Sequence, residues 1–279
     1  MTTDTTSTHY TVDWSTVAEG WDAYRDSVER MKTGLSARLL AGLALRQGER
    51  VLELGAGTGE FARRLAAEVG EQGHVLATDV AAGMVDLIRA TTQDLTNVDV
   101  AQADAADTGQ PDAAFDAVVF RMGLMFLPEP DVALGEMRRV LRPGGRIGIV
   151  TWAGLEHNPW LTTVGMTAMM NGLISGGLPT APGGPLSLGD PAHLEQLARD
   201  AGFDDVSVTS LPVPFELSGV DDHLGHVTSL APPLKAAYDN ASAEQRASWR
   251  AALEQATQHF RTDDGETIPG LALLLTATT

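Results

Sequence analysis

Cysteine is absent from this chain of 279 residues. Its absence excludes disulfides, thiolate metal sites, iron–sulfur clusters and cysteine nucleophiles, so the chemistry has to use other groups and no metal is expected. Long hydrophobic runs are also missing, because no stretch approaches the ~20 apolar residues of a membrane span. The first residues show no basic start followed by an apolar core. We therefore expect a cytoplasmic protein with no membrane partner.

Positive charge is scarce. The chain has 19 lysine and arginine residues against 37 aspartate and glutamate residues, which gives a formal net charge of −18. This charge repels phosphate backbones and no local basic cluster offsets it, so a nucleic-acid partner is not expected. Apolar residues make up 43% of the sequence, which is enough for a large core in a chain of this length.

Short β-type runs alternate with helical ones from residue 50 onward, after a helical stretch over residues 11–46. This alternation predicts the α/β class, with a parallel sheet that helices cover on both faces. The predicted strands cover residues 50–54, 74–80, 98–104, 115–123, 145–152, 205–217 and 270–279.

Two stretches interrupt the alternation. One is an apolar, Met-rich helical segment with a Gly/Pro-rich loop, and the other is a second helical stretch. We interpret both, together with the N-terminal helix, as a lid. The predicted organisation is an N-terminal helical lid segment (1–33), a cofactor-binding core (34–152), a lid insertion (153–189), a core helix and strand (190–216), a second helical lid insertion (217–266) and a terminal core strand (267–279).

The stretch "RVLELGAGTGEFARRLA", residues 50–66, places three glycines where a strand meets a helix. Such a turn lets bare backbone approach a ligand near the N–H groups of the helix start. A P-loop needs lysine and serine or threonine after its last glycine, but Glu60 and Phe61 follow Gly59. A dinucleotide fingerprint needs its third glycine at the position of Glu60, whose charge would face a pyrophosphate. Both phosphate-binding interpretations are therefore disfavoured.

The spacing Gly-x-Gly-x-Gly behind an acidic residue, in "ELGAGTG", suits a ligand without phosphate. On these residues the chain resembles the class I S-adenosylmethionine-dependent methyltransferases, and more closely the small-molecule group that includes the ubiquinone and menaquinone biosynthesis C-methyltransferases. The resemblance covers about residues 14–160. It implies a Rossmann-like, seven-stranded, mostly parallel sheet with helices on both faces, a helical lid, and S-adenosyl-L-methionine as the cofactor.

The resemblance also assigns roles to residues at the strand ends. Asp79 closes the second strand and accepts both ribose hydroxyls, and Met84 packs on the adenine face. Asp104 follows the third strand and faces the adenine exocyclic amine beside the backbone of Ala105. Asp107 is the rival for that contact.

The fourth strand ends in Arg121 and Met122, at the edge where open α/β sheets bind ligands. Arg121 either holds a carboxylate or forms a surface ion pair. Glu53 is expected to orient the glycine loop by accepting backbone or amino hydrogens. The complete predicted cofactor site is Glu53, Gly55, Ala56, Gly57, Gly59, Asp79, Val80, Met84, Asp104, Ala105, Arg121 and Met122.

Methyl transfer from a sulfonium is an in-line displacement, so alignment and exclusion of water supply much of the rate and no covalent residue is required. If a base is needed, histidine is the natural candidate. His157 follows the fifth strand and is the first choice, and His223 and His226 come next. Each competes with a surface or capping role. The predicted acceptor wall consists of Trp152, Asn158 and Trp160, closed from the N-terminal side by Trp21 and Tyr24.

The two insertions are rich in Met, Leu and Trp and favour a small, largely apolar acceptor such as a quinone, polyketide or terpenoid. Core packing is an alternative role for the stripe Met166, Met169 and Met170. Two other functions stay open: a cyclase or scaffold that keeps the cofactor without transferring methyl, and a nicotinamide-dependent oxidoreductase. The acceptor, the methylated atom and the choice between a monomer and a homodimer are not determined by the sequence.

Overall fold

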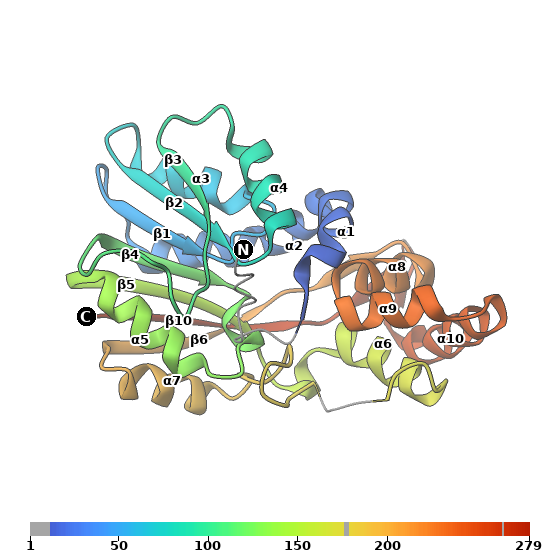
Figure 1. Ribbon diagram of the computed structural model, residues 1–279. Helices are drawn as coiled ribbons and strands as arrows, with labels where there is room; N and C mark the ends of the chain where they lie inside the picture. The colour runs from blue at the N-terminus through green and yellow to red at the C-terminus, as the bar shows by residue number, and fades with distance from the viewer. Residues whose placement is uncertain (1–11, 176–178, 264) are drawn as a thin grey trace, which may run out of the picture.

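The computed structural model of the chain describes residues 12–175, 179–263 and 265–279. Figure 1 shows a large sheet surrounded by helices, with a further group of helices beyond one end of its strands. Parts of the three predicted lid segments, residues 1–11, 176–178 and 264, lie outside the described residues.

The main sheet has seven strands in the order β3-β2-β1-β4-β5-β10-β6. Five of them pair in parallel, and β10 runs antiparallel to both β5 and β6. The prediction of a seven-stranded, mostly parallel α/β sheet is therefore confirmed. The strands are β1 (Arg50–Leu54), β2 (His74–Asp79), β3 (Val98–Gln102), β4 (Phe115–Arg121), β5 (Leu141–Trp152), β6 (Asp204–Pro212) and β10 (Leu271–Thr278).

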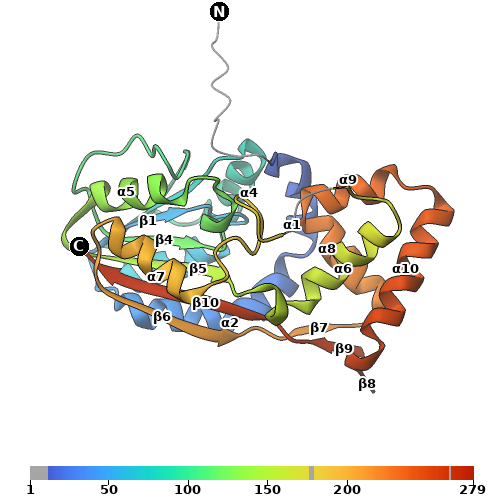
Figure 2. The same ribbon diagram turned by 90° about the horizontal axis from the view of Figure 1, so that it is seen from below.

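Helices cover both faces of this sheet. On one face α2 (Arg25–Leu43) packs against β5 and β10, while α5 (Pro130–Val140) and α7 (Pro191–Asp200) lie on the opposite face (Figure 2). The central strands β1 and β4 are almost continuously buried, as expected for parallel strands covered on both sides. The core that positions the site is therefore closed on both faces and open only at the strand ends.

Two helices start at the carboxyl ends of β1 and β2. The helix α3 (Glu60–Val69) buries Phe61, Leu65 and Val69, whose spacing of four places them on one face. It ends at Gly70, which has a φ of +66°. The helix α4 (Ala82–Thr92) packs against β2 and β3. Both helices therefore present their N-terminal ends to the same edge of the sheet.

A second group of elements lies beyond that edge (Figure 1). It contains the short helices η1 (Trp14–Val17) and α1 (Ala18–Ala23), the helix α6 (Pro159–Met170), and α8 (Val220–Leu230), α9 (Pro232–Asn240) and α10 (Ala243–Thr257). A small sheet joins them, with the order β7-β9-β8, formed by β7 (Phe215–Leu217), β8 (Arg261–Thr262) and β9 (Gly265–Ile268). We refer to these elements as the lid. The two remaining short helices of the core edge are η2 (Leu124–Phe126) and η3 (Leu155–His157), and η4 (Gln258–Phe260) follows α10.

The predicted strand over residues 205–217 is two strands in two different sheets. The main-sheet part ends at Pro212, and the small-sheet part begins at Phe215. Pro212 and Pro214 have no N–H group and cannot donate to a ladder, so the chain leaves the main sheet between them. Val213 still donates its N–H to the carbonyl of Gly270, at 2.8 Å. The three-stranded sheet was not predicted.

Among the described residues, no helix is long and apolar enough to cross a membrane. The same ranges contain no group of three or more His, Asp or Glu side chains arranged to hold a metal ion.

Candidate active site

Three glycines shape the turn between β1 and α3. Gly55, Gly57 and Gly59 have φ angles of +59°, +60° and +84°, which side-chain-bearing residues rarely adopt. A Cβ atom on Gly55 would lie 2.9 Å from the Phe120 ring, and one on Gly59 would lie 3.0 Å from the Cα atom of Ile88. A Cβ atom on Gly57 would meet no atom within 4 Å. The outer glycines therefore allow close packing, whereas the middle one leaves open space. We refer to this turn, residues 55–59, as the cradle.

Asp79, the last residue of β2, lies against this turn. One of its carboxylate oxygens accepts the N–H of Gly57 at 3.1 Å, and the other accepts the N–H of Ala81 at 3.0 Å. The second bond holds the start of α4, where Ala81 has no side chain that can cap the helix. Burial raises the pKa of Asp79, although its backbone hydrogen bonds act in the opposite direction. The carboxylate thus stands at the cradle, while its predicted ribose contact stays a prediction.

Glu53 approaches the cradle from β1. Its side chain is 1% exposed, and its Oε2 atom has no hydrogen-bond partner among the described residues. Burial raises the pKa of this carboxyl to about 8, and Glu29 and Asp79 add to the effect while Arg121 opposes it. An unpartnered buried carboxyl oxygen is costly unless a ligand satisfies it. A cationic amine at this position would do so, and the amino acid end of S-adenosylmethionine carries one.

The far side of the cradle is formed by the ends of β2 and β3. Met84 is buried and packs with Val17 of the lid and with Ala81. The Asp104 side chain accepts the N–H of Ala106 at 2.9 Å, and the backbone of Asp104 forms an isolated antiparallel β-bridge with that of Asp107. Ala105 is buried and Val80 is half-buried. The structure therefore brings these predicted residues to the same edge as the glycine turn, and the choice between the two aspartates stays a prediction.

Arg121 is neither free nor on the surface. Its guanidinium donates to both carboxylate oxygens of Glu29 on α2, with the shorter distance 2.9 Å, and to the hydroxyl of Ser36 at 2.9 Å. It also lies 4.5 Å from the centroid of the Phe61 ring. The side chains of Arg121 and Glu29 are 7% and 13% exposed. The carboxylate that Arg121 holds therefore belongs to the protein, and the pair fastens α2 to the cofactor edge.

Met122 follows Arg121 with a φ of +64°, which is unusual for a residue with a side chain. Its N–H donates to the carbonyl of Val150 at 2.9 Å, so the strained residue is tied to β5. Backbone strain of this kind clusters at functional sites. Its position at the carboxyl end of β4 fits the predicted site.

Aromatic rings from four elements form the lid side of the site. Trp160 of α6 stacks on Phe215 of β7, with ring centroids 4.0 Å apart and planes 15° apart. Trp152 at the end of β5 lies 5.0 Å from Trp160. His226 of α8 meets Phe215 edge-on at 6.0 Å and Tyr24 at 5.1 Å. Trp152 and Trp160 thus lie in direct contact, and Tyr24 is linked to them through His226 and Phe215. The sequence reasoning missed Phe215, and a role of these rings in binding the acceptor stays a prediction.

Asn158 and Trp21, two other residues of the predicted wall, have structural partners. The amide of Asn158 donates to the carbonyls of Ala153 and Leu271 and accepts the N–H groups of Leu271 and Trp160. Since Asn158 is fully buried, these bonds account for both ends of its side chain. The Trp21 indole N–H donates to the carbonyl of Leu230 in α8, at 3.2 Å. Both residues hold the wall in place.

The three candidate histidines differ sharply in environment. The side chain of His157 is 49% exposed on η3 and lies 3.3 Å from Glu156. His223 donates through Nε2 to the carbonyl of Trp160 at 2.6 Å, and its Nδ1 atom lies 4.0 Å from Glu266. Burial lowers the pKa of His226 to about 4, with smaller contributions in the same direction from His223 and Lys32. Only His226 combines burial with a place in the aromatic wall.

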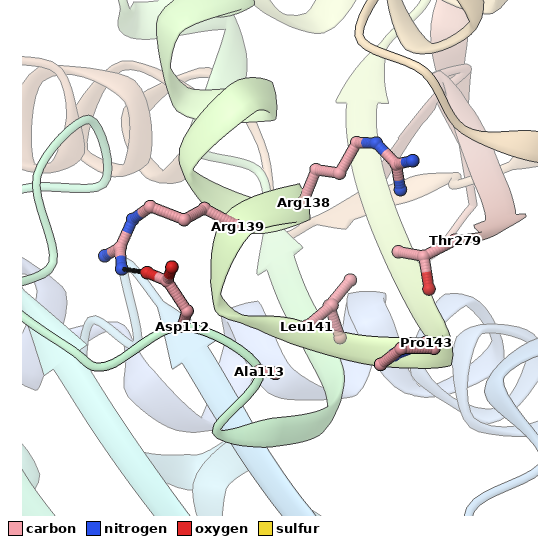
Figure 3. A pocket seen from close by; sticks show the side chains of 7 residues that line it. All are labelled: Asp112, Ala113, Arg138, Arg139, Leu141, Pro143 and Thr279. Atoms are coloured by element: carbon pink, nitrogen blue, oxygen red, sulfur yellow. Dashed lines mark hydrogen bonds and ion pairs between the residues drawn. The ribbon is translucent and has the colours of Figure 1, made fainter.

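A cavity of about 290 Å³ lies at the opposite end of the sheet, and Figure 3 shows the seven side chains that line it. Its most polar side chain, Arg139, is already bound by Asp112 and Glu136. The cavity lies away from the glycine turn and takes no part in the site described above.

The seven-stranded sheet and the glycine turn at its carboxyl edge define a Rossmann-like domain without a phosphate loop. Comparison with known proteins then gives the class: residues 51–145 match the family model described as a methyltransferase domain. Residues 51–145 therefore form a methyltransferase domain, in agreement with the resemblance stated from the sequence.

Curated relatives agree with a methyltransferase domain. The ubiquinone/menaquinone biosynthesis C-methyltransferase UbiE of Teredinibacter turnerae is 38% identical over 117 residues, which are 41% of this chain and 47% of that protein. The chain thus spans about half the length of the curated relatives it matches.

Solved structures show a similar fold over nearly the whole chain. The YcgJ protein of Bacillus subtilis has a TM-score of 0.59 at 16% identity and covers 88% of this chain and 97% of its own. The cyclase SpnF has a TM-score of 0.56 at 22% identity, with coverage of 96% and 97%. Because one of these neighbours is a cyclase, the fold by itself does not decide the reaction.

Proposed function

We propose that the protein transfers a methyl group from S-adenosyl-L-methionine to a small, largely apolar organic acceptor. The observation that carries the proposal is the cradle, where the open Gly57 backbone, the Asp79 carboxylate and the unpartnered Oε2 atom of Glu53 meet at one strand edge. When bound there, the cofactor supplies a methyl carbon activated by a sulfonium.

The residues of the cradle divide the binding work. Glu53 takes the amino group of the cofactor, because that contact satisfies its buried oxygen. Asp79 has a second lone pair on each oxygen and uses these for the ribose hydroxyls. Met84 lines the adenine side, and Asp104 or Asp107 accepts from the exocyclic amine. This assignment follows the predicted roles and agrees with where each side chain lies.

The acceptor lies between the cradle and the aromatic wall of the lid. Planar rings at Trp152, Trp160, Phe215 and Tyr24 suit an apolar acceptor, and the burial of the first three would exclude water from the reacting atoms. A quinone, polyketide or terpenoid has the required character, and the similarity to UbiE favours the quinone. The net charge of −18 opposes nucleic acid as the acceptor, and we place the protein in the cytoplasm.

Calorimetric titration with S-adenosylmethionine and, in parallel, with NAD tests the binding step. We expect one site for S-adenosylmethionine and no measurable heat with NAD, and the reverse would support an oxidoreductase. Incubation with the methyl-labelled donor and extracts of apolar metabolites tests the transfer. Tight binding of the donor with no labelled product from any extract would favour the cyclase or scaffold.

A further inference from the structure

One face of α2 carries a polar stripe directed at the cofactor edge. Its members, Arg25, Glu29, Lys32 and Ser36, are spaced by four, three and four residues and therefore lie on one side of the helix. Arg25 donates to Glu60 at the start of α3 and to Thr91 near the end of α4. Glu29 and Ser36 bind Arg121. Lys32 lies within the same stripe but has no hydrogen bond to any described residue.

The Lys32 side chain is half-buried, and its amine interacts with groups from three elements. Its Nζ atom lies 5.0 Å from the centroid of the Trp21 ring. The Glu29–Arg121 pair acts on it electrostatically from the sheet edge, and it acts in turn on His226 of α8. Tyr24, whose pKa burial raises, stands against the same histidine. The amine therefore lies between the cofactor edge and the lid, in the region to which we assign the acceptor.

Lysine is a rare residue in this protein. The sequence contains two lysines, Lys32 and Lys235, beside 17 arginines. The Lys235 side chain is 38% exposed and pairs with Asp239 at 2.6 Å. An arginine cannot release its proton at ordinary pH, whereas a lysine can. The chain thus places a basic group that can lose its proton at the partly buried, unpartnered position of the stripe.

Resting on the proposed function, we propose that Lys32 is a catalytic residue that takes the proton from an acidic hydroxyl, an enol or a phenol, of the acceptor. The acceptor O–H bond breaks and an N–H bond forms on Nζ, while the electron pair stays on the acceptor. That pair, on the oxygen or on a conjugated carbon, then bonds to the methyl carbon as the carbon–sulfur bond breaks and its electrons pass to sulfur. The ammonium that results is stabilised by Glu29 and by the face of Trp21.

The surroundings of the Lys32 amine give it a basicity that suits the removal of this proton. Burial and, to a smaller extent, the charge of Arg121 lower the pKa of Lys32 to about 7, while Glu29 opposes both. A base is most effective when its pKa lies near the working pH. A permanently charged residue at this position would bind an anion but could not accept a proton.

The first test measures how the reactivity of the Lys32 amine depends on pH, without any ligand. The protein is labelled with trace acetic anhydride at increasing pH, and the peptides of Lys32 and Lys235 are quantified by mass spectrometry. We expect Lys32 to gain reactivity around pH 7, well below the ordinary range of a lysine amine, with the Lys235 peptide as the internal reference. Parallel titration of the two lysines overturns the proposal.

The second test uses 4-nitrophenol, whose anion is coloured, with protein saturated with S-adenosylhomocysteine. In the wild type, binding of the anion should be strongest near pH 7 and weaken on both sides, because the complex holds one proton between amine and phenol. Lys32→Met should weaken binding roughly tenfold or more through loss of a charge-assisted hydrogen bond, while Lys235→Met should not change it. Lys32→Arg should keep the binding but lose the decline at alkaline pH.

The Lys32→Arg variant also separates Lys32 from its titrating neighbours. Glu53, His226 and Tyr24 remain in that variant, so an alkaline decline that they cause would persist and would overturn the proposal. Equal dye affinity in Lys32→Met, or no dye binding in the wild type, overturns it as well. If S-adenosylhomocysteine fails to bind the wild type in calorimetry, the proposed function has failed, whereas the labelling experiment still decides whether Lys32 is a neutral amine near pH 7.

Discussion

The cofactor edge and the lid wall are built in different ways. At the cofactor edge the contacts join residues of neighbouring strands and the turns that follow them, as in the bond from Gly57 to Asp79. In the lid wall they join segments far apart in the chain, as in the bond from Trp21 to Leu230 and the stack of Trp160 on Phe215. The cofactor edge is therefore a local structure with a motif, whereas the wall depends on how distant helices dock.

This difference predicts where a single substitution removes binding. Gly57→Val should abolish measurable binding of S-adenosylhomocysteine, because the side chain fills the open cradle and a φ of +60° is strained for a β-branched residue. Gly48→Val is the matched control, since Gly48 has a φ of +86° and also has open space around a Cβ atom, but lies outside the cradle. Both variants should lose about 1–2 kcal/mol of stability in thermal unfolding. Normal affinity in folded Gly57→Val would show that the turn is only structural.

Asp79→Ala should have the next largest effect. It removes the acceptor of the Gly57 and Ala81 N–H groups and the proposed ribose contacts, so affinity for S-adenosylhomocysteine should fall roughly 100-fold or more. Asp79→Asn keeps one oxygen and should lose less. Asp99→Ala, an exposed change on the neighbouring strand, serves as the control. Calorimetric affinities for the three variants check this order, and an unchanged affinity in Asp79→Ala removes the assignment.

The motif explains how much of the site could be predicted. Strand and helix alternation identifies the core because both signals are local, and the seven main strands follow from it. The acidic residues at the strand ends are found in the same way. The strands β8 and β9 could not be predicted because they have only two and four residues and a polar composition.

The contacts of α2 with the sheet edge, unlike those of the glycine turn, could not be predicted at the same level. The partner of Arg121 is Glu29, 92 residues away, and the place of Lys32 depends on the docking of α2 on the sheet edge. A signal was present, since Glu29 and Lys32 interrupt the apolar stripe that contains Val28 and Leu35. Reading that signal as functional requires knowing which elements the helix faces.

Glu53→Gln should lower the affinity for S-adenosylhomocysteine by a smaller factor, about tenfold. It should also change the number of protons that are released when the ligand binds. The pKa of Glu53 is raised from 4.5 to about 8, so the folded protein holds a proton near neutral pH. Binding a cationic amine favours the ionised form, so about one proton should be released near pH 7 by the wild type and none by the variant. Titrations in buffers with different heats of ionisation measure this number, and equal release by both proteins would contradict the assignment.

The same group predicts a pH dependence of stability. The pKa of Glu53 is higher in the folded protein than in the unfolded chain. Its contribution to the free energy of unfolding is therefore fully present below pH 4.5 and is lost as pH rises through about 8. The wild type should therefore lose about 2–4 kcal/mol of unfolding free energy relative to Glu53→Gln across this range. Denaturant unfolding at several pH values checks the direction.

The smallest effect is expected at His157. Its side chain is half-exposed and touches only an exposed glutamate, so His157→Ala should change stability by less than about 0.5 kcal/mol and leave cofactor affinity unchanged. His226→Asn, in the buried wall, is the informative comparison. A large loss of methyl transfer in His157→Ala, with none in His226→Asn, would return His157 to the role that the sequence predicts for it.

The most direct measurement is a crystal structure of the protein with S-adenosylhomocysteine. The account predicts the amino group of the ligand within hydrogen-bond distance of the Glu53 Oε2 atom, the ribose hydroxyls on Asp79, and the sulfur directed toward the space between Lys32 and the aromatic wall. A ligand bound away from the Gly57 cradle, or bound there with its sulfur turned away from the lid, would contradict it.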